Sequence, residues 1–156
     1  MRMVMSAILL LVIAVASGQV PADHVKFVDS IETFVNTNMK KFLVKKDTGQ
    51  ITSAKNQTAS YQKQYYVDRN TKGLCLATYM RRYTNGTLIN DTYYYLHNKP
   101  ISGYRIKQVK RKPLEEEAYY FYNDRTYKQN DTTTLAPDNE MRRNAESLLA
   151  QYKNSK

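Results

Sequence analysis

The sequence predicts a mainly β protein: an antiparallel up-and-down barrel, complete or incomplete, with a short N-terminal helix and a C-terminal helix. Three observations support this fold class. Six or seven β-prone runs follow one another between residues 40 and 129, short turn motifs separate them, and an amphipathic helical pattern flanks them at each end. Strands joined by tight turns pair with their chain neighbours, and such a meander can close into a barrel around a pocket.

The first eighteen residues have the pattern of a secretory signal peptide. A charged start is followed by the apolar run AILLLVIAVA and then by small residues up to Gly18. The run is shorter than the roughly 20 residues that a membrane span needs. We therefore expect residues 1–18 to be removed, residues 19–156 to form a single secreted, extracellular domain, and no membrane span to remain.

Four sequons agree with secretion, because N-x-[ST] is the acceptor pattern for N-glycosylation. They begin at Asn56, Asn85, Asn90 and Asn130. The sequence thus predicts a glycoprotein, unless the tripeptides merely reflect abundant Asn and Thr in turns.

The two flanking helices follow from apolar spacing. Residues 23–37 carry an apolar stripe, and Asp23 is the predicted N-cap. Residues 138–153 form the second helix, with Asp138 or Asn139 as its cap. Its apolar stripe consists of Met141, Ala145, Leu148, Leu149 and Tyr152.

The strands are predicted from β-prone runs between turn residues. They cover residues 40–47, 59–69, 74–84, 87–97, 101–111, 114–122 and 126–129, with loops expected at 50–58 and 130–137. The strongest hairpin signal is Asn85-Gly86 between two of these runs, since Asn-Gly suits a type I′ turn.

Composition leaves few catalytic options. The 156 residues include a single Cys, two His and five Gly, and no metalloprotease, hydrolase or CxxC motif is present. We predict no catalytic residues, no metal site and no cofactor. Cys75 is expected to be a free thiol, which is either a buried small hydrophobe or the site of an intermolecular disulfide.

Aromatic and acidic residues are the candidate ligand contacts. The chain has 14 Tyr, a residue that commonly fills the core from a strand and that can also line a ligand pocket with its ring. Residues 115–117 form the one acidic run, and in a strand either Glu116 alone or its two neighbours can face a barrel interior. The predicted contacts are the mid-strand residues Tyr79, Tyr94, Glu116 and Tyr120.

The basic residues offer a different function. The chain has a formal net charge of +10, and Arg105 and Lys107 share a face of one predicted strand, with residues 110–112 at its end. Such a surface is typical of proteins that bind an acidic glycan, a host protein or another polyanion without a ligand cavity, or it is simply a solvated sheet edge. Because the charge is spread over many strands, we expect no nucleic acid partner.

Several segments together resemble the salivary lipocalins of ticks: the helix at 23–37 leading into KKFLVKKDTG, then LCLATYM, TLINDTYYYLH and EEAYYFYND. The similarity covers roughly residues 23–125. It implies a lipocalin-like barrel of eight strands that sequesters a biogenic amine, such as histamine or serotonin, or a lipid mediator. It also implies several disulfides and a G-x-W motif, whereas this chain has one Cys and no Trp. A cystatin-like inhibitor is a further alternative, for which the Q-x-V-x-G loop is missing.

Overall fold

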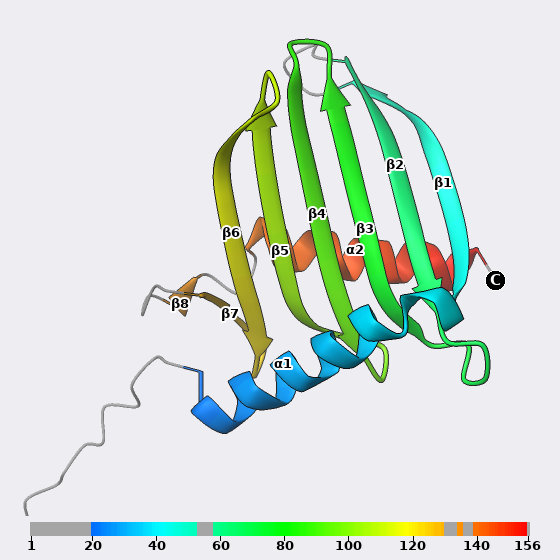
Figure 1. Cartoon of the computed structure of the whole chain (residues 1–156), viewed down its shortest axis with the longest axis vertical. Coiled ribbons are helices and arrows are strands. Elements are labelled where there is room, and N and C mark those ends of the chain that lie inside the picture. Colours follow the sequence, from blue (N-terminus) through cyan, green and yellow to red (C-terminus); the bar gives the residue numbers. More distant parts are fainter. Residues whose placement is uncertain (1–19, 53–57, 130–133, 136–138, 156) are drawn as a thin grey trace, which may run out of the picture.

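Over the residues that the structure describes, the fold is an antiparallel sheet of eight strands with one helix on each face (Figure 1). The computed structural model describes residues 20–52, 58–129, 134–135 and 139–155. Its elements are α1 (Ala22–Thr37), the 3-10 turn η1 (Met39–Lys41), β1 (Leu43–Thr52), β2 (Thr58–Val67), β3 (Leu74–Tyr83), β4 (Thr87–Leu96), β5 (Lys99–Val109), β6 (Lys112–Tyr122), β7 (Arg125–Lys128), β8 (Thr134–Leu135) and α2 (Glu140–Asn154). The predicted signal peptide and the sequons at Asn56 and Asn130 lie outside the described residues.

The predicted up-and-down order is confirmed, because every strand pairs antiparallel with its neighbours in the chain. Over the described residues the sheet is open, with β1 and β8 at its edges. The two-residue β8 falls within the linker predicted at 130–137. The loop predicted from residue 50 starts later, because Gln50 and Ile51 continue the pairing of β1 with β2.

The strand connections correct the turn prediction. At Asn85-Gly86 only Gly86 has a positive φ, and its N–H donates to the Tyr83 carbonyl at 3.1 Å, so the loop has three residues and is not type I′. The Asn85 side chain favours this form by accepting from the Thr87 N–H at 2.9 Å. Two-residue turns with both φ angles positive occur instead at residues 97–98, 110–111 and 123–124.

Both flanking helices are confirmed, with corrected ends. The N-cap position of α1 is Pro21, so Asp23 lies in the first turn, where its carboxylate still favours the positive helix end. In α2 the cap is Asn139, whose side-chain oxygen accepts from the Met141 N–H at 2.8 Å. All five residues of the predicted α2 stripe are buried.

The sheet separates two apolar cores. α2 covers one face, and α1 crosses the end of the other face where β3 begins and β4 ends (Figure 1). The α2 core contains Tyr65, Val67, Leu74, Ala77, Tyr93, Tyr95, Tyr119 and Phe121 with the α2 stripe, and the α1 core contains Val28, Val35, Phe42, Leu76, Tyr94, Ile101, Tyr120 and Tyr127. Eight of the 14 tyrosines are thus buried, and all eight belong to these two cores.

Gly103 provides space that the α2 core needs. It pairs with Tyr93 across β4 and β5, and a β-carbon at this position would lie 3.0 Å from the Tyr93 ring. The missing side chain allows the fully buried Tyr93 ring to lie against β5, where its hydroxyl reaches the Met141 sulfur at 3.6 Å.

Candidate functional site

A large open cavity lies on the α1 face, between α1 and strands β4, β5, β6 and β7. Its volume is about 870 Å³, within the usual range for small-molecule sites. Its lining residues are Glu32, Asn36, Thr92, Tyr94, Tyr104, Arg105, Ile106, Glu116, Glu117, Ala118, Lys128 and Gln129. The cavity exists because α1 covers only one end of the sheet, and the polar residues beyond it stay open.

Glu32 of α1 brings a carboxylate to the wall of this cavity. One of its oxygens accepts from the Ser102 hydroxyl and the other from the Tyr104 hydroxyl, both at 2.5 Å. Burial raises the pKa of Glu32, although these two hydrogen bonds oppose the rise. In the described part of the chain, Glu32 forms no ion pair, so a half-buried negative charge has only hydroxyl partners.

Aromatic rings stand beside this carboxylate. The ring centroids of Tyr94 and Tyr104 lie 6.0 Å apart in an edge-to-face arrangement. The Tyr94 hydroxyl donates to Asn36 of α1 at 2.9 Å, which fixes the ring against the helix. Burial raises the pKa of Tyr104, and so does its contact with Glu32. Tyr104 therefore stays protonated and remains a donor to the carboxylate.

The acidic run alternates between the faces of β6. Glu116 is exposed, lines the cavity and forms no ion pair with a described residue, whereas Glu115 and Glu117 pair with Lys107 and Lys128. Burial would raise the pKa of Glu117, but hydrogen bonds from Lys128 and Tyr119 lower it. Two of the three carboxylates are thus neutralised within the protein, and Glu116 is left facing the cavity.

The cationic residues in the lining are occupied elsewhere. Arg105 makes two hydrogen bonds to Asp91 and one to Glu140 of α2. Burial alone would lower the pKa of Arg105, yet the two carboxylates raise it overall. Lys128 donates to Glu117 at 2.6 Å. The charge that faces the cavity without a protein counter-ion is therefore negative.

The four residues predicted as ligand contacts divide between the two faces. Tyr94 and Glu116 line the cavity. Tyr120 is buried below it, where its hydroxyl lies 3.4 Å from Asp29 and accepts from Gln129 at 3.1 Å. Tyr79 lies on the α2 face, packed beside Lys63 and Arg81. Tyr79 of β3 is paired with Asp91 of β4, and paired residues of adjacent strands lie on the same face of the sheet. This face is the one turned away from α1.

Sequence reasoning missed Glu32, Asn36, Tyr104 and Ile106. A signal for Glu32 was present, because it lies four residues after Val28 and three before Val35, the two buried residues of α1. A carboxylate at that spacing faces the sheet with them.

Other predicted sites are placed as follows. Cys75 has no disulfide partner and is half-buried, and burial raises its thiol pKa. Asn85 is exposed on the β3–β4 loop, and Asn90 is half-buried in β4. The described residues contain no group of three or more His, Cys, Asp or Glu side chains arranged to hold a metal ion.

The described residues form two helices longer than one turn, α1 and α2. Neither helix is long and apolar enough to cross a membrane. Comparison with protein-family models, with curated proteins and with solved structures gave no match.

Proposed function

We propose that the protein is a secreted, lipocalin-like binder that sequesters a small organic cation of the biogenic amine class in the α1-face cavity. One observation carries this proposal: Glu32 places a carboxylate in the cavity wall with no cationic partner among the described residues. A buried charge is stable when a counter-charge accompanies it, and a ligand ammonium supplies one.

The surroundings of Glu32 suit the rest of such a ligand. Glu116 adds a second carboxylate at the cavity, and the rings of Tyr94 and Tyr104 offer faces that attract a cation. Ile106 contributes an apolar contact. The resemblance to tick salivary lipocalins supports the same ligand class, because binding of histamine or serotonin is what that family implies.

We predict that serotonin binds the purified protein and that Glu32→Gln weakens the binding by about 10- to 100-fold. This range corresponds to the roughly 1.5–3 kcal/mol of a hydrogen bond to a charged group. Titration calorimetry with serotonin, histamine and a fatty acid measures it. The matched control is Glu115→Gln, which removes a carboxylate from the opposite face of the same strand and should leave affinity unchanged.

Three results would contradict the amine proposal. They are no heat with either amine, equal serotonin affinity for Glu32→Gln and the wild type, and binding of the fatty acid alone. The last of these would assign the cavity to a lipid mediator.

Serotonin affinity should also depend on pH. Only the ionised carboxylate attracts the ammonium, so affinity falls as pH is lowered through the pKa of Glu32. Because burial raises that pKa, the fall begins at a higher pH than the ordinary value of 4.5 would give. The serotonin ammonium keeps its charge throughout, so the decline reports protonation of the protein and not of the ligand. Affinity measured from pH 4 to pH 8 should show this decline for the wild type and a clearly smaller decline for Glu32→Gln, in which the carboxylate of Glu116 remains at the cavity.

A further inference from the structure

The turn between β5 and β6 carries two residues that are poorly suited to its backbone. Lys110 and Arg111 have φ values of 50° and 67°. Both positions of a type I′ turn need positive φ, where the β-carbon of most L-residues is strained and Asn-Gly is preferred. The turns at residues 97–98 and 123–124 use His, Asn and Asp, the non-glycine types that tolerate this region best. The β5–β6 turn therefore carries two long cationic side chains, although its backbone conformation favours Asn and Gly.

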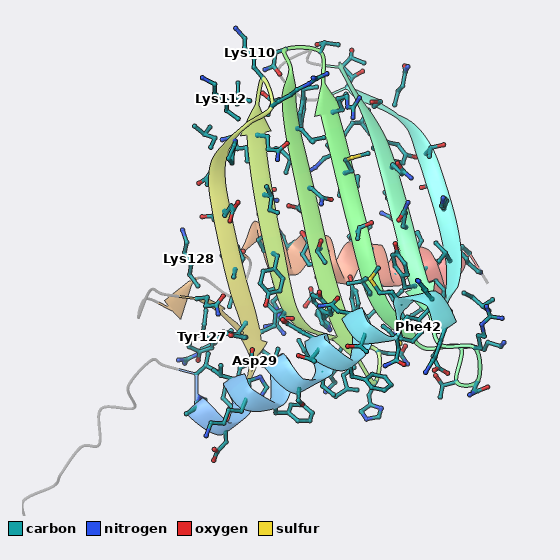
Figure 2. The ribbon with its side chains drawn as sticks, viewed as in Figure 1. Asp29, Phe42, Lys110, Lys112, Tyr127 and Lys128 are labelled. Carbon is teal, nitrogen blue, oxygen red and sulfur yellow. The ribbon has the colours of Figure 1, made fainter. Side chains whose placement is uncertain are left out.

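Further cations lie beside this turn. Lys112 follows it directly, and Arg82 is the next-to-last residue of β3 on the adjoining hairpin. The two hairpins are joined by a hydrogen bond from the Lys110 N–H to the Gly86 carbonyl at 3.2 Å. We call Arg82, Lys110, Arg111 and Lys112 the cationic tip. All four are exposed, and Lys110 and Lys112 project from the end of the sheet far from α1 (Figure 2).

The charge of the cationic tip is not neutralised by described residues. None of its four side chains forms an ion pair or hydrogen bond with any of them. The nearest carboxylate along β6, Glu115, is 3.5 Å from Lys107 and is already paired. Elsewhere on the sheet, by contrast, cations such as Lys63, Arg81 and Arg105 each lie against a carboxylate.

We propose that the cationic tip binds a linear sulfated glycan. Sulfate oxygens accept charge-assisted hydrogen bonds from Lys and Arg, and a flexible polyanion can contact both hairpins at once. A membrane surface fits less well, because apolar area buried beside the charges strengthens binding to it. Around the tip the described residues offer a single exposed large apolar side chain, Leu114 at 64% exposure. This site is independent of the cavity, which lies toward the other end of the sheet.

The test is the double substitution Lys110→Asn with Arg111→Gly, assayed for binding to a heparin oligosaccharide over a range of NaCl concentrations. We expect binding to weaken by about 10- to 100-fold near 0.1 M salt. In DNA binding, each contacting cation adds about 0.9 to the slope of log affinity against log salt concentration. Since the variant lacks two cations, the corresponding slope for the heparin oligosaccharide should fall by roughly two. The same variant should melt at a higher temperature, because Asn-Gly fits the turn. Weaker binding together with higher stability excludes misfolding as the cause.

The control is Lys40→Gln with Lys41→Gln, which removes two exposed cations at the opposite end of the sheet. The protein is made without N-glycans, because Asn85 lies on the adjoining loop. Undiminished heparin affinity of the turn variant would overturn the proposal. So would an equal loss in the control, which would indicate net charge alone, and so would binding to phosphatidylserine vesicles without binding to heparin.

Discussion

Asp91→Ala should lower the free energy of unfolding by about 3–5 kcal/mol, the usual cost of removing one partner from a buried ion pair. Asp91 is in the middle of β4 with 0% of its surface exposed. Its carboxylate accepts from Arg81 and makes a bidentate contact with Arg105, at 2.7 and 3.0 Å. The alanine would leave two guanidinium groups, 11% and 14% exposed, facing each other without the charge between them.

The arrangement also joins the sheet to α2. Arg105 bridges Asp91 to Glu140 in the first turn of the helix, at 2.9 Å. The hydrogen bond from Arg105 lowers the pKa of Glu140. Without Asp91 the two arginines repel each other beneath α2, so we expect the loss of stability to extend to the helix.

Chemical denaturation of two single variants, Asp91→Ala and Glu115→Ala, measures the loss in free energy of unfolding for each. The second variant breaks the Lys107–Glu115 pair on the same face, where the two side chains are 36% and 45% exposed. Exposed pairs contribute only about 0–1 kcal/mol, because water screens them. If Asp91→Ala cost no more than Glu115→Ala, the charge cluster would have no structural role.

The sequence predicts those elements that local rules determine. The α2 stripe is the clearest case, because Met141, Ala145, Leu148, Leu149 and Tyr152 follow one helical face and are all buried. The antiparallel order was predictable for a similar reason, since short turns leave adjacent strands no other partner.

Strand facing was not predictable in the same way. Tyr79 and Tyr94 both lie near the middle of β-prone runs, yet Tyr94 faces α1 and Tyr79 faces α2. Side chains alternate along a strand, so a shift of one residue reverses every assignment. Which alternate residues of a strand face α1 and which face α2 depends on how the two helices pack on the sheet. These helix–sheet contacts join residues that are far apart in the sequence. Turn type was equally hidden, because Lys110-Arg111 adopts positive φ against its own preference.

Long-range pairing also concealed the charge clusters. Asp91 and Arg105 are 14 residues apart in the chain and become neighbours only through the β4–β5 register. Glu32 meets Tyr104 across 72 residues. The sequence indicated a carboxylate on the buried side of α1, but nothing local showed which hydroxyl groups would surround it.

Tyr95→Ala should cost about 3–5 kcal/mol, the usual range for removing a fully buried aromatic side chain. Tyr95 is 2% exposed, packs in the core between the sheet and α2, and donates its hydroxyl proton to the Ala145 carbonyl at 2.8 Å. Tyr95→Phe removes only this hydrogen bond and should cost about 0.5–1.5 kcal/mol. The difference between the two variants separates ring packing from the hydrogen bond.

Tyr94 provides a control one residue away on the opposite face. Its hydroxyl contacts Asn36 of α1, whereas that of Tyr95 contacts α2. Hydrogen exchange resolves the two effects, because Tyr95→Phe should speed amide exchange in residues 140–154 and Tyr94→Phe in residues 22–37. If both substitutions accelerated both helices equally, the two cores would open together. The alternation of Tyr94 and Tyr95 would then not divide the molecule into separately stabilised faces, and ligand binding in the α1-face cavity would be coupled to the docking of α2.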